Sequence, residues 1–190
     1  AAVNIDLTSK APDAGTSALI AWDVVKGKRL WTVPNPGFWN GGTMATAGNL
    51  VFQGHADGTF NAFSADSGKK LWSFAAQTGV LAPPITYTVK GKQYVTVLSG
   101  FGGSGSLFGG VVARFGWQAR TQPRRVLTFT LDGTANLPPA PPPTKLEPVA
   151  DPAFRPDATL AEHGKKVYYT RCVVCHGIDL MAAGIAPDLR

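Results

Sequence analysis

Apolar residues in the first hundred positions fall in short groups separated by turns that contain glycine. Alternation of apolar and polar residues over four to eight positions is typical of half-buried strands. The segment VKGK, Val89 to Lys92, predicts a tight hairpin. The strands predicted in this way are Leu50–Phe52, Thr59–Phe63, Lys70–Phe74, Ile85–Val89 and Gln93–Leu98.

The same region contains an internal repeat. AWDVVKGKRLW begins at Ala21 and AFSADSGKKLW begins at Ala62, an offset of 41 residues. The alanine, a glycine-lysine pair and the final leucine-tryptophan pair recur at this offset. A period of this length is the size of one four-stranded propeller blade. The repeat therefore predicts about two blades of a β-propeller.

Each repeated residue has an expected role in such a blade. The alanines belong on an inner strand, where a larger side chain would not pack against the next blade. Trp31 and Trp72 supply apolar surface and an indole N–H for docking one blade onto its neighbour. We expect turn residues, and not catalytic carboxylates, at Asp23, Gly27, Asp66, Ser67 and Gly68.

Proline marks the end of this β region. The chain has 15 prolines, and eight of them lie between Pro138 and Pro156. Such a segment cannot contribute to a sheet ladder and favours extended geometry, which predicts a semi-rigid linker. The chain is therefore expected to comprise a mainly β part at 1–134, a Pro-rich linker at 135–157 and a helical part at 158–190.

Composition and charge exclude several classes of protein. Hydrophobic residues make up 44% of the 190 residues, which excludes a generally disordered chain. No apolar run is long enough to span a membrane, and the first residues, AAVNIDLTSK, lack the charged and apolar regions of a signal peptide, so we expect neither feature. The net charge is +6, but the basic residues are scattered without interleaved aromatics, so we expect no nucleic-acid partner.

Candidate chemistry is concentrated near the C-terminus. Cys172-Val173-Val174-Cys175-His176 is a C-x-x-C-H motif, which is typical of c-type haem attachment. One helical turn places two thiols to bond the haem vinyl groups, and His176 becomes the proximal iron ligand. A thioredoxin-like redox pair and half of a zinc site are the alternatives. The first lacks its βαβ setting and the second lacks another ligand pair.

The residues after the motif extend the haem prediction. Pro187 lies at a suitable distance for its carbonyl to accept the proximal imidazole N–H. Met181 is only five residues from His176, too close to reach the opposite face of the haem. No other sixth ligand follows, so we expect a truncated cytochrome c domain, which disfavours a self-contained small cytochrome.

The tryptophan repeats, the linker and the C-x-x-C-H segment together resemble the quinohaemoprotein alcohol dehydrogenases, which use pyrroloquinoline quinone (PQQ). The densest stretches of resemblance run from Trp39 to Trp72 and from Thr78 to Gly103. The resemblance implies a C-terminal fragment: about two blades of an eight-bladed propeller, followed by the start of an α-helical cytochrome c domain.

The resemblance also implies cofactor contacts. Trp39 and Asn40 in the WNGG segment match positions that line the quinone pocket, and Gly102 in GFGG matches a second loop near it. An aromatic plane and an amide suit a flat ring system that carries carbonyl oxygens. The catalytic Asp, the calcium ligands and an adjacent cysteine pair belong to earlier blades. His55, in QGHADG, is expected to be a surface histidine at an outer turn.

The resulting hypothesis is a PQQ-dependent alcohol dehydrogenase, incomplete in this chain, that passes electrons from the quinone to a bound haem c. The implied acceptor is another cytochrome or a membrane quinone, and a membrane-bound cytochrome subunit is a candidate partner. The implied location is the periplasm, including the periplasmic face of the inner membrane. The alternative is a non-catalytic propeller module with an attached electron-transfer cytochrome, which would not bind the quinone.

Overall fold

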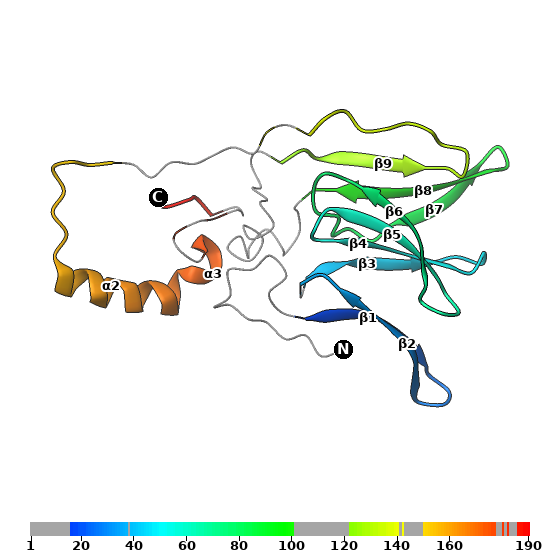
Figure 1. Cartoon of the computed structure of the whole chain (residues 1–190), viewed down its shortest axis with the longest axis horizontal. Coiled ribbons are helices and arrows are strands. Elements are labelled where there is room, and N and C mark those ends of the chain that lie inside the picture. The colour runs from blue at the N-terminus through cyan, green and yellow to red at the C-terminus, as the bar shows by residue number, and fades with distance from the viewer. Residues whose placement is uncertain are drawn as a thin grey trace. The chain divides into compact units, whose positions relative to one another are not determined.

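The computed structural model describes residues 16–37, 39–100, 122–140, 142, 150–177, 180, 182 and 186–190. Contacts divide the chain into two compact units. The first, here called the β unit, holds the strands of the described residues, and the second, the helical unit, holds the described helices α2 and α3 (Figure 1). The β unit includes Gln122–Pro141, so the first residues of the predicted linker belong to it.

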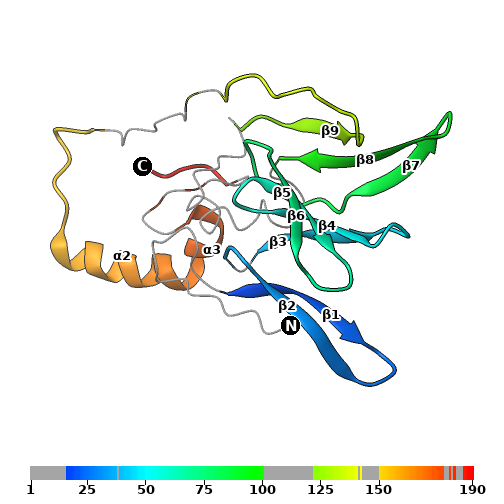
Figure 2. The same ribbon diagram turned by 45° about the vertical axis from the view of Figure 1, so that its right-hand side comes forward.

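A four-stranded antiparallel sheet forms the centre of the β unit (Figure 2). Its strands follow one another in sequence order, as in a meander. They are β3 (Asn40–Ala45), β4 (Leu50–His55), β5 (Thr59–Ser64) and β6 (Lys70–Ala75). This sheet is one complete blade. The alternation along the chain correctly predicted β4, β5 and β6.

The sheet before it is the hairpin of β1 (Ser17–Asp23) and β2 (Lys28–Asn35). Asp23 Oδ1 accepts the backbone N–H groups of Val25 and Lys26, each at 3.0 Å, and Gly27 has a φ of 59°. These contacts build the turn, which confirms the turn roles predicted for Asp23 and Gly27.

The repeat is visible in the backbone. Ala21 pairs with Trp31 across the first hairpin, and Ala62 pairs with Trp72 across β5 and β6. In both copies the register shifts immediately after the alanine. The 41-residue offset therefore reproduces both the strand pairing and the position of the irregularity, as expected for a repeated blade.

The third sheet consists of β7 (Ile85–Val89), β8 (Lys92–Ser99) and β9 (Arg125–Phe129). Lys90 and Gly91 connect β7 and β8 with φ values of 51° and 79°, so the predicted VKGK hairpin is confirmed. Strand β9 pairs with β8 although 25 residues separate Ser99 from its partner Arg125 along the chain, counting from position 100 to 124. The sequence pattern did not predict β9 or β3.

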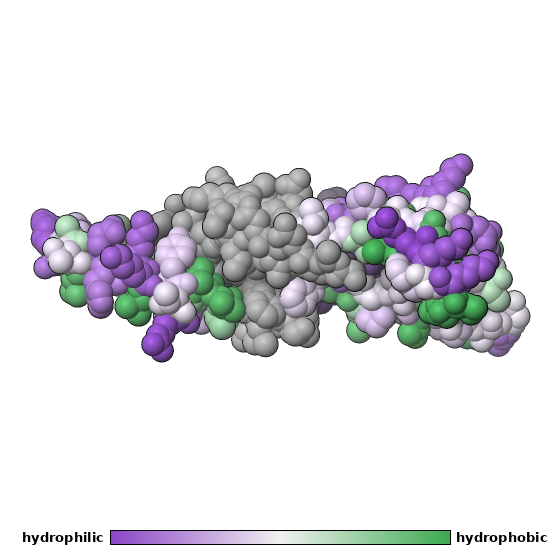
Figure 3. All heavy atoms as spheres, turned by 90° about the horizontal axis from the view of Figure 1, so that it is seen from below, coloured by the Kyte–Doolittle hydropathy of each residue, from purple (hydrophilic) through white to green (hydrophobic). Residues whose placement is uncertain are grey.

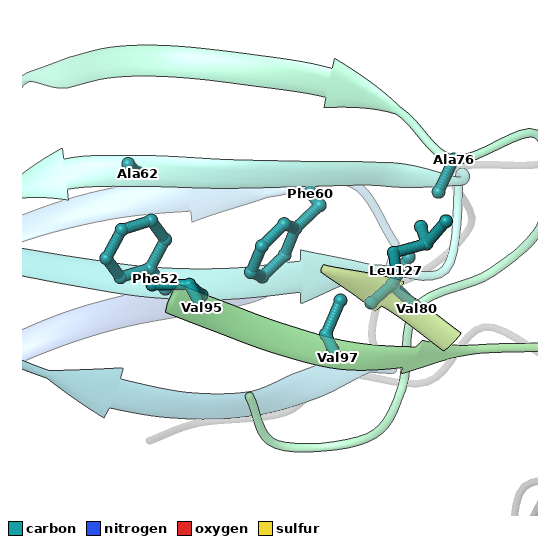
Figure 4. Packing of buried hydrophobic residues seen from close by; sticks show 8 residues of the cluster. All are labelled: Phe52, Phe60, Ala62, Ala76, Val80, Val95, Val97 and Leu127. Atoms are coloured by element: carbon teal, nitrogen blue, oxygen red, sulfur yellow. The ribbon is translucent and has the colours of Figure 1, made fainter. Parts of the chain in front are cut away.

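The hydrophobic core lies between the second and third sheets (Figure 4). Phe60 is fully buried, and its ring centroid lies 5.8 Å from that of Phe52 and 5.4 Å from that of Phe129. Val97 on β8 and Leu127 on β9 complete the cluster from the facing sheet. Alternate residues of β4, β5 and β8 therefore face one shared core.

The two repeated tryptophans dock neighbouring sheets, as predicted. Trp31 Nε1 donates a hydrogen bond of 2.8 Å to the Ala65 carbonyl in the next sheet. Gly68 has a φ of 71°, and a Cβ there would lie 2.8 Å from the Trp31 ring. Trp72 meets Phe129 of the third sheet edge to face, with ring centroids 5.2 Å apart. Gly68 thus serves both a turn and the docking of Trp31.

The helical unit contains α2 (Ala158–Arg171) and α3 (Val173–His176). Asp157 caps α2, because its carboxylate accepts the Leu160 N–H. Neither helix has a buried residue among those described. Hydrophobic and hydrophilic side chains mix on this exposed helical segment, seen at the left of Figure 3. No described helix is both long and apolar enough to span a bilayer.

Candidate haem-attachment site

The two cysteines lie at the junction of the helices. Cys172 ends α2 and begins α3, and Cys175 lies within α3. The Cys172 carbonyl accepts the N–H of Cys175 at 3.2 Å and that of His176 at 2.9 Å. Both thiols are free, and Cys175 is exposed. One tight helical turn therefore carries both thiols and the imidazole.

His176 is oriented by the chain segment that follows. Its Nδ1 lies 2.9 Å from the Pro187 carbonyl oxygen. A carbonyl can only accept, so Nδ1 carries a proton, and in the neutral form of the ring Nε2 then keeps its lone pair. A neutral imidazole with its second nitrogen held in this way is the form that binds a metal. The hydrogen bond predicted for Pro187 is confirmed.

A network of contacts closes the segment that brings Pro187 to His176. The backbone N–H of Leu189 donates to the Leu180 carbonyl at 3.1 Å. Arg190 NH2 lies 3.0 Å from Asp188 Oδ2, and the Arg190 backbone N–H and Nε both donate to Asp188 Oδ1. Burial acts to raise the pKa of Asp188, but hydrogen bonds from Arg190 outweigh it and leave the pKa below its ordinary value.

Tyr168 ties the haem motif to α2. Its hydroxyl donates to the carbonyl of Gly177, the residue directly after His176. Gly177 ends α3 with φ 80° and ψ 166°, a conformation that suits glycine. Both contacts hold the C-terminal end of the motif, because Tyr168 binds Gly177 and Pro187 binds His176.

The WNGG segment lies at the start of β3 in the β unit. Trp39 is half-buried, and Asn40 is the first residue of the strand. The Asn40 side-chain nitrogen donates to Ser17 Oγ and to the Pro36 carbonyl, each at 3.0 Å, and its oxygen accepts the Ala56 N–H. Both N–H groups of the Asn40 amide, which was predicted to contact the quinone, thus donate to groups within the chain. Gly102 and Met181 lie outside the described residues.

His55 is not a surface histidine, and that prediction is wrong. It is the last residue of β4, and only 6% of it is exposed. Gly54, the residue before His55, allows another segment of the chain to come close to the strand. A Cβ on Gly54 would lie 2.3 Å from the Val80 carbonyl oxygen, and Val80 in turn donates its N–H to the His55 carbonyl.

The surroundings of His55 assign its tautomer. Thr59 donates its hydroxyl proton to Asp57, and Asn61 donates to both Thr59 Oγ1 and His55 Nδ1. Nδ1 is therefore an acceptor and Nε2 carries the proton, with no hydrogen-bond partner among the described residues. Burial lowers the pKa of His55, Asp57 partly opposes this, and Lys70 adds to it.

These observations separate the candidate chemistries. The free thiols and the oriented imidazole fit covalent haem attachment with His176 as an axial ligand. Within the described ranges no three His, Cys, Asp or Glu side chains converge on one point.

Comparison with known proteins points in the same direction. The family described as glucose/ethanol/alcohol dehydrogenase, beta-propeller domain, with the short name PQQ, matches residues 33–95. The matched segment runs from β2 into β8 and so includes the whole central blade.

Full-length relatives extend the similarity to the helical unit. The chain is 47% identical over 97% of its length to the quinohemoprotein alcohol dehydrogenase ADH IIB of Pseudomonas putida, covering 26% of that protein. It is 44% identical over 90% of its length to the "Alcohol dehydrogenase (quinone), dehydrogenase subunit" of Gluconobacter oxydans, covering 22%. The chain thus spans about a quarter of the length of these relatives.

A solved structure gives the same result. The structure of the quinohemoprotein alcohol dehydrogenase ADHIIG from Pseudomonas putida superposes with a TM-score of 0.74 at 46% sequence identity. The match covers 93% of this chain and 25% of that protein. Sequence and fold therefore agree on one group of proteins.

Proposed function

Since the chain belongs to the family of PQQ-dependent alcohol dehydrogenases, we propose that the protein containing it oxidises a small alcohol and passes the electrons to a haem c held by Cys172, Cys175 and His176. The observation that carries the haem assignment is the 2.9 Å hydrogen bond from His176 Nδ1 to the Pro187 carbonyl. It selects the tautomer in which Nε2 can bind iron.

Each residue of the motif has a separate task in this proposal. Cys172 and Cys175 supply the two sulfurs that hold the porphyrin covalently, and His176 supplies a nitrogen ligand from the same helical turn. Pro187 fixes the rotation and the tautomer of that imidazole. When bound, the haem supplies one-electron transfer chemistry, which the side chains of this segment cannot provide themselves.

In this proposal the β unit supplies only part of the quinone site. Trp39 would offer its ring to a flat cofactor, and Gly102 would allow the backbone to approach it. Asn40 would be the amide contact beside Trp39, and its three hydrogen bonds hold the start of β3 in place. The general base and the calcium ligands would come from parts of the protein outside this chain.

The acceptor and the location belong to the same proposal. A relative named "Alcohol dehydrogenase (quinone), dehydrogenase subunit" supports a quinone acceptor, for which we propose a membrane quinone, and association with another subunit, for which we propose a membrane-bound cytochrome. A second cytochrome is the other acceptor that suits a one-electron haem. Haem c attachment favours the periplasm, including the periplasmic face of the inner membrane.

Intact mass measured under denaturing conditions tests the haem assignment. Thioether bonds survive denaturation, so the wild-type protein should carry the mass of one haem, and Cys172→Ala with Cys175→Ala should carry none. His176→Ala should lose the axial ligand and change the haem absorption spectrum. His163→Ala, on the exposed face of α2, is the matched control and should leave both the mass and the spectrum unchanged. A wild-type protein without haem would overturn the proposal.

A further inference from the structure

We propose that Asp188 is a positioning residue of the haem site, which holds the Pro187 carbonyl against His176 and thereby lowers the reduction potential of the haem. This inference rests on the proposed haem assignment. It concerns a residue that neither touches the imidazole nor belongs to the C-x-x-C-H motif.

The first argument is the number of groups that converge on one carboxylate. Asp188 Oδ1 accepts the backbone N–H and the Nε–H of Arg190, each at 3.0 Å. Oδ2 accepts from Arg190 NH2, also at 3.0 Å. The backbone N–H of Ala182 interacts with the same carboxylate. Asp188 therefore joins two points of the chain on either side of Pro187.

The second argument is burial. The Asp188 side chain is only 13% exposed and that of Arg190 only 22%. By comparison, the ion pair of Lys92 with Asp132 in the β unit, at 2.8 Å, has side chains 45% and 70% exposed. A half-buried bidentate pair is less screened by solvent and holds a fixed geometry, whereas an exposed pair contributes little.

The third argument is the position of Pro187 in the sequence. It precedes Asp188 directly, so any movement of Asp188 also moves the carbonyl that His176 contacts. Pro187 has no N–H with which to anchor itself. The contacts of Asp188, together with the hydrogen bond from Leu189 to Leu180, hold this segment in place.

The electronic consequence follows from the hydrogen bond. An imidazole whose Nδ1–H donates to a carbonyl is a more basic ligand, and a more basic ligand favours ferric over ferrous iron. A looser segment lengthens this hydrogen bond and weakens the effect. Removing the Asp188 carboxylate should therefore raise the reduction potential.

The experiment is a redox titration of the haem-loaded full-length protein, followed by haem absorbance. For Asp188→Asn we expect the ratio of ferric to ferrous haem at a fixed potential to fall roughly tenfold, which is about 59 mV for a one-electron couple. Arg190→Lys, which keeps a cation but loses the bidentate fork, should give a smaller shift in the same direction. Asp151→Asn is the control, because Asp151 is an exposed carboxylate of the same unit that caps only a local turn.

A second readout follows the hydrogen bond itself. The Nδ1–H proton of His176, observed by NMR in the ferrous protein, should exchange with solvent faster in Asp188→Asn than in wild type or Asp151→Asn. Equal potentials and equal exchange in all three proteins would overturn the inference. If Asp188→Asn fails to retain haem, Arg190→Gln takes its place, and an unchanged potential there would overturn it as well. Haem missing from the wild type would instead refute the proposed function.

Discussion

Phe60 on β5 is fully buried, whereas Leu160 on α2 is 68% exposed. In the β unit, apolar side chains from two sheets meet in one core, and Trp31 and Trp72 join neighbouring sheets. In the helical unit neither helix buries a residue among those described. The structure of that unit rests instead on caps and hydrogen bonds.

This difference matches the tasks proposed for the two units. A core of side chains can support strands within the chain itself, since each buried apolar group adds to stability. A short segment around a prosthetic group gains its stabilisation from the group that it binds. Its own residues need only set the positions of the ligands. The contacts of Tyr168, Pro187 and Asp188 are all of this kind.

The largest expected effect is from core truncation. Phe60→Ala should reduce the free energy of unfolding by about 3–5 kcal/mol, because it removes a fully buried ring and leaves a cavity. Leu160→Ala should change it by less than about 0.5 kcal/mol. Urea unfolding of the two variants provides the measurement. A cost above about 1 kcal/mol for Leu160→Ala would contradict the comparison and show that α2 is covered by another part of the protein.

A smaller effect is expected in the pH dependence of stability, which His55 should impose on the β unit. Burial lowers the pKa of His55 below the 6.5 of an exposed imidazole, so the unfolded chain takes up a proton more readily than the folded one. The contribution of neutral His55 to the free energy of unfolding is therefore fully present above pH 6.5 and is lost as the pH falls below 6.5. The loss should be no steeper than about 1.4 kcal/mol per pH unit.

Thermal unfolding of the β unit between pH 7.5 and 5 tests this expectation. His55→Gln should flatten the pH dependence. His163→Gln should not, because His163 lies on the exposed surface of α2. Identical pH profiles for wild type and His55→Gln would show that the buried imidazole does not control the acid stability of the β unit.

The features that the sequence revealed are local ones. The strands β4 to β8 follow from alternation and turns, and the 41-residue offset predicts the shared register of the two alanines. The C-x-x-C-H motif and the Pro187 carbonyl depend on spacing along one short segment. Such features need no knowledge of distant parts of the chain.

The failures arise from contacts between distant residues. Strand β9 exists because it pairs with β8 across a long interval of sequence. His55 is buried where Gly54 admits the backbone of Val80, so the QGHADG segment, expected to form an outer turn, begins with the end of a buried strand. Asp188 gave no signal in the sequence, since its importance depends on the path by which the chain returns to His176.

The smallest expected effect concerns the cap of α2. Asp157→Ala removes the acceptor for the Leu160 N–H and should cost the helix about 1 kcal/mol. Because the described residues of α2 are not buried, its amides should then exchange with deuterium about five times faster. Asp151→Ala, which removes a similar side-chain contact outside the helix, should leave the α2 amides unchanged. Amides of β4 and β5 should be unaffected in both variants, since their protection comes from the core. Faster exchange of these amides in Asp157→Ala would mean that the cap of α2 also supports the β unit.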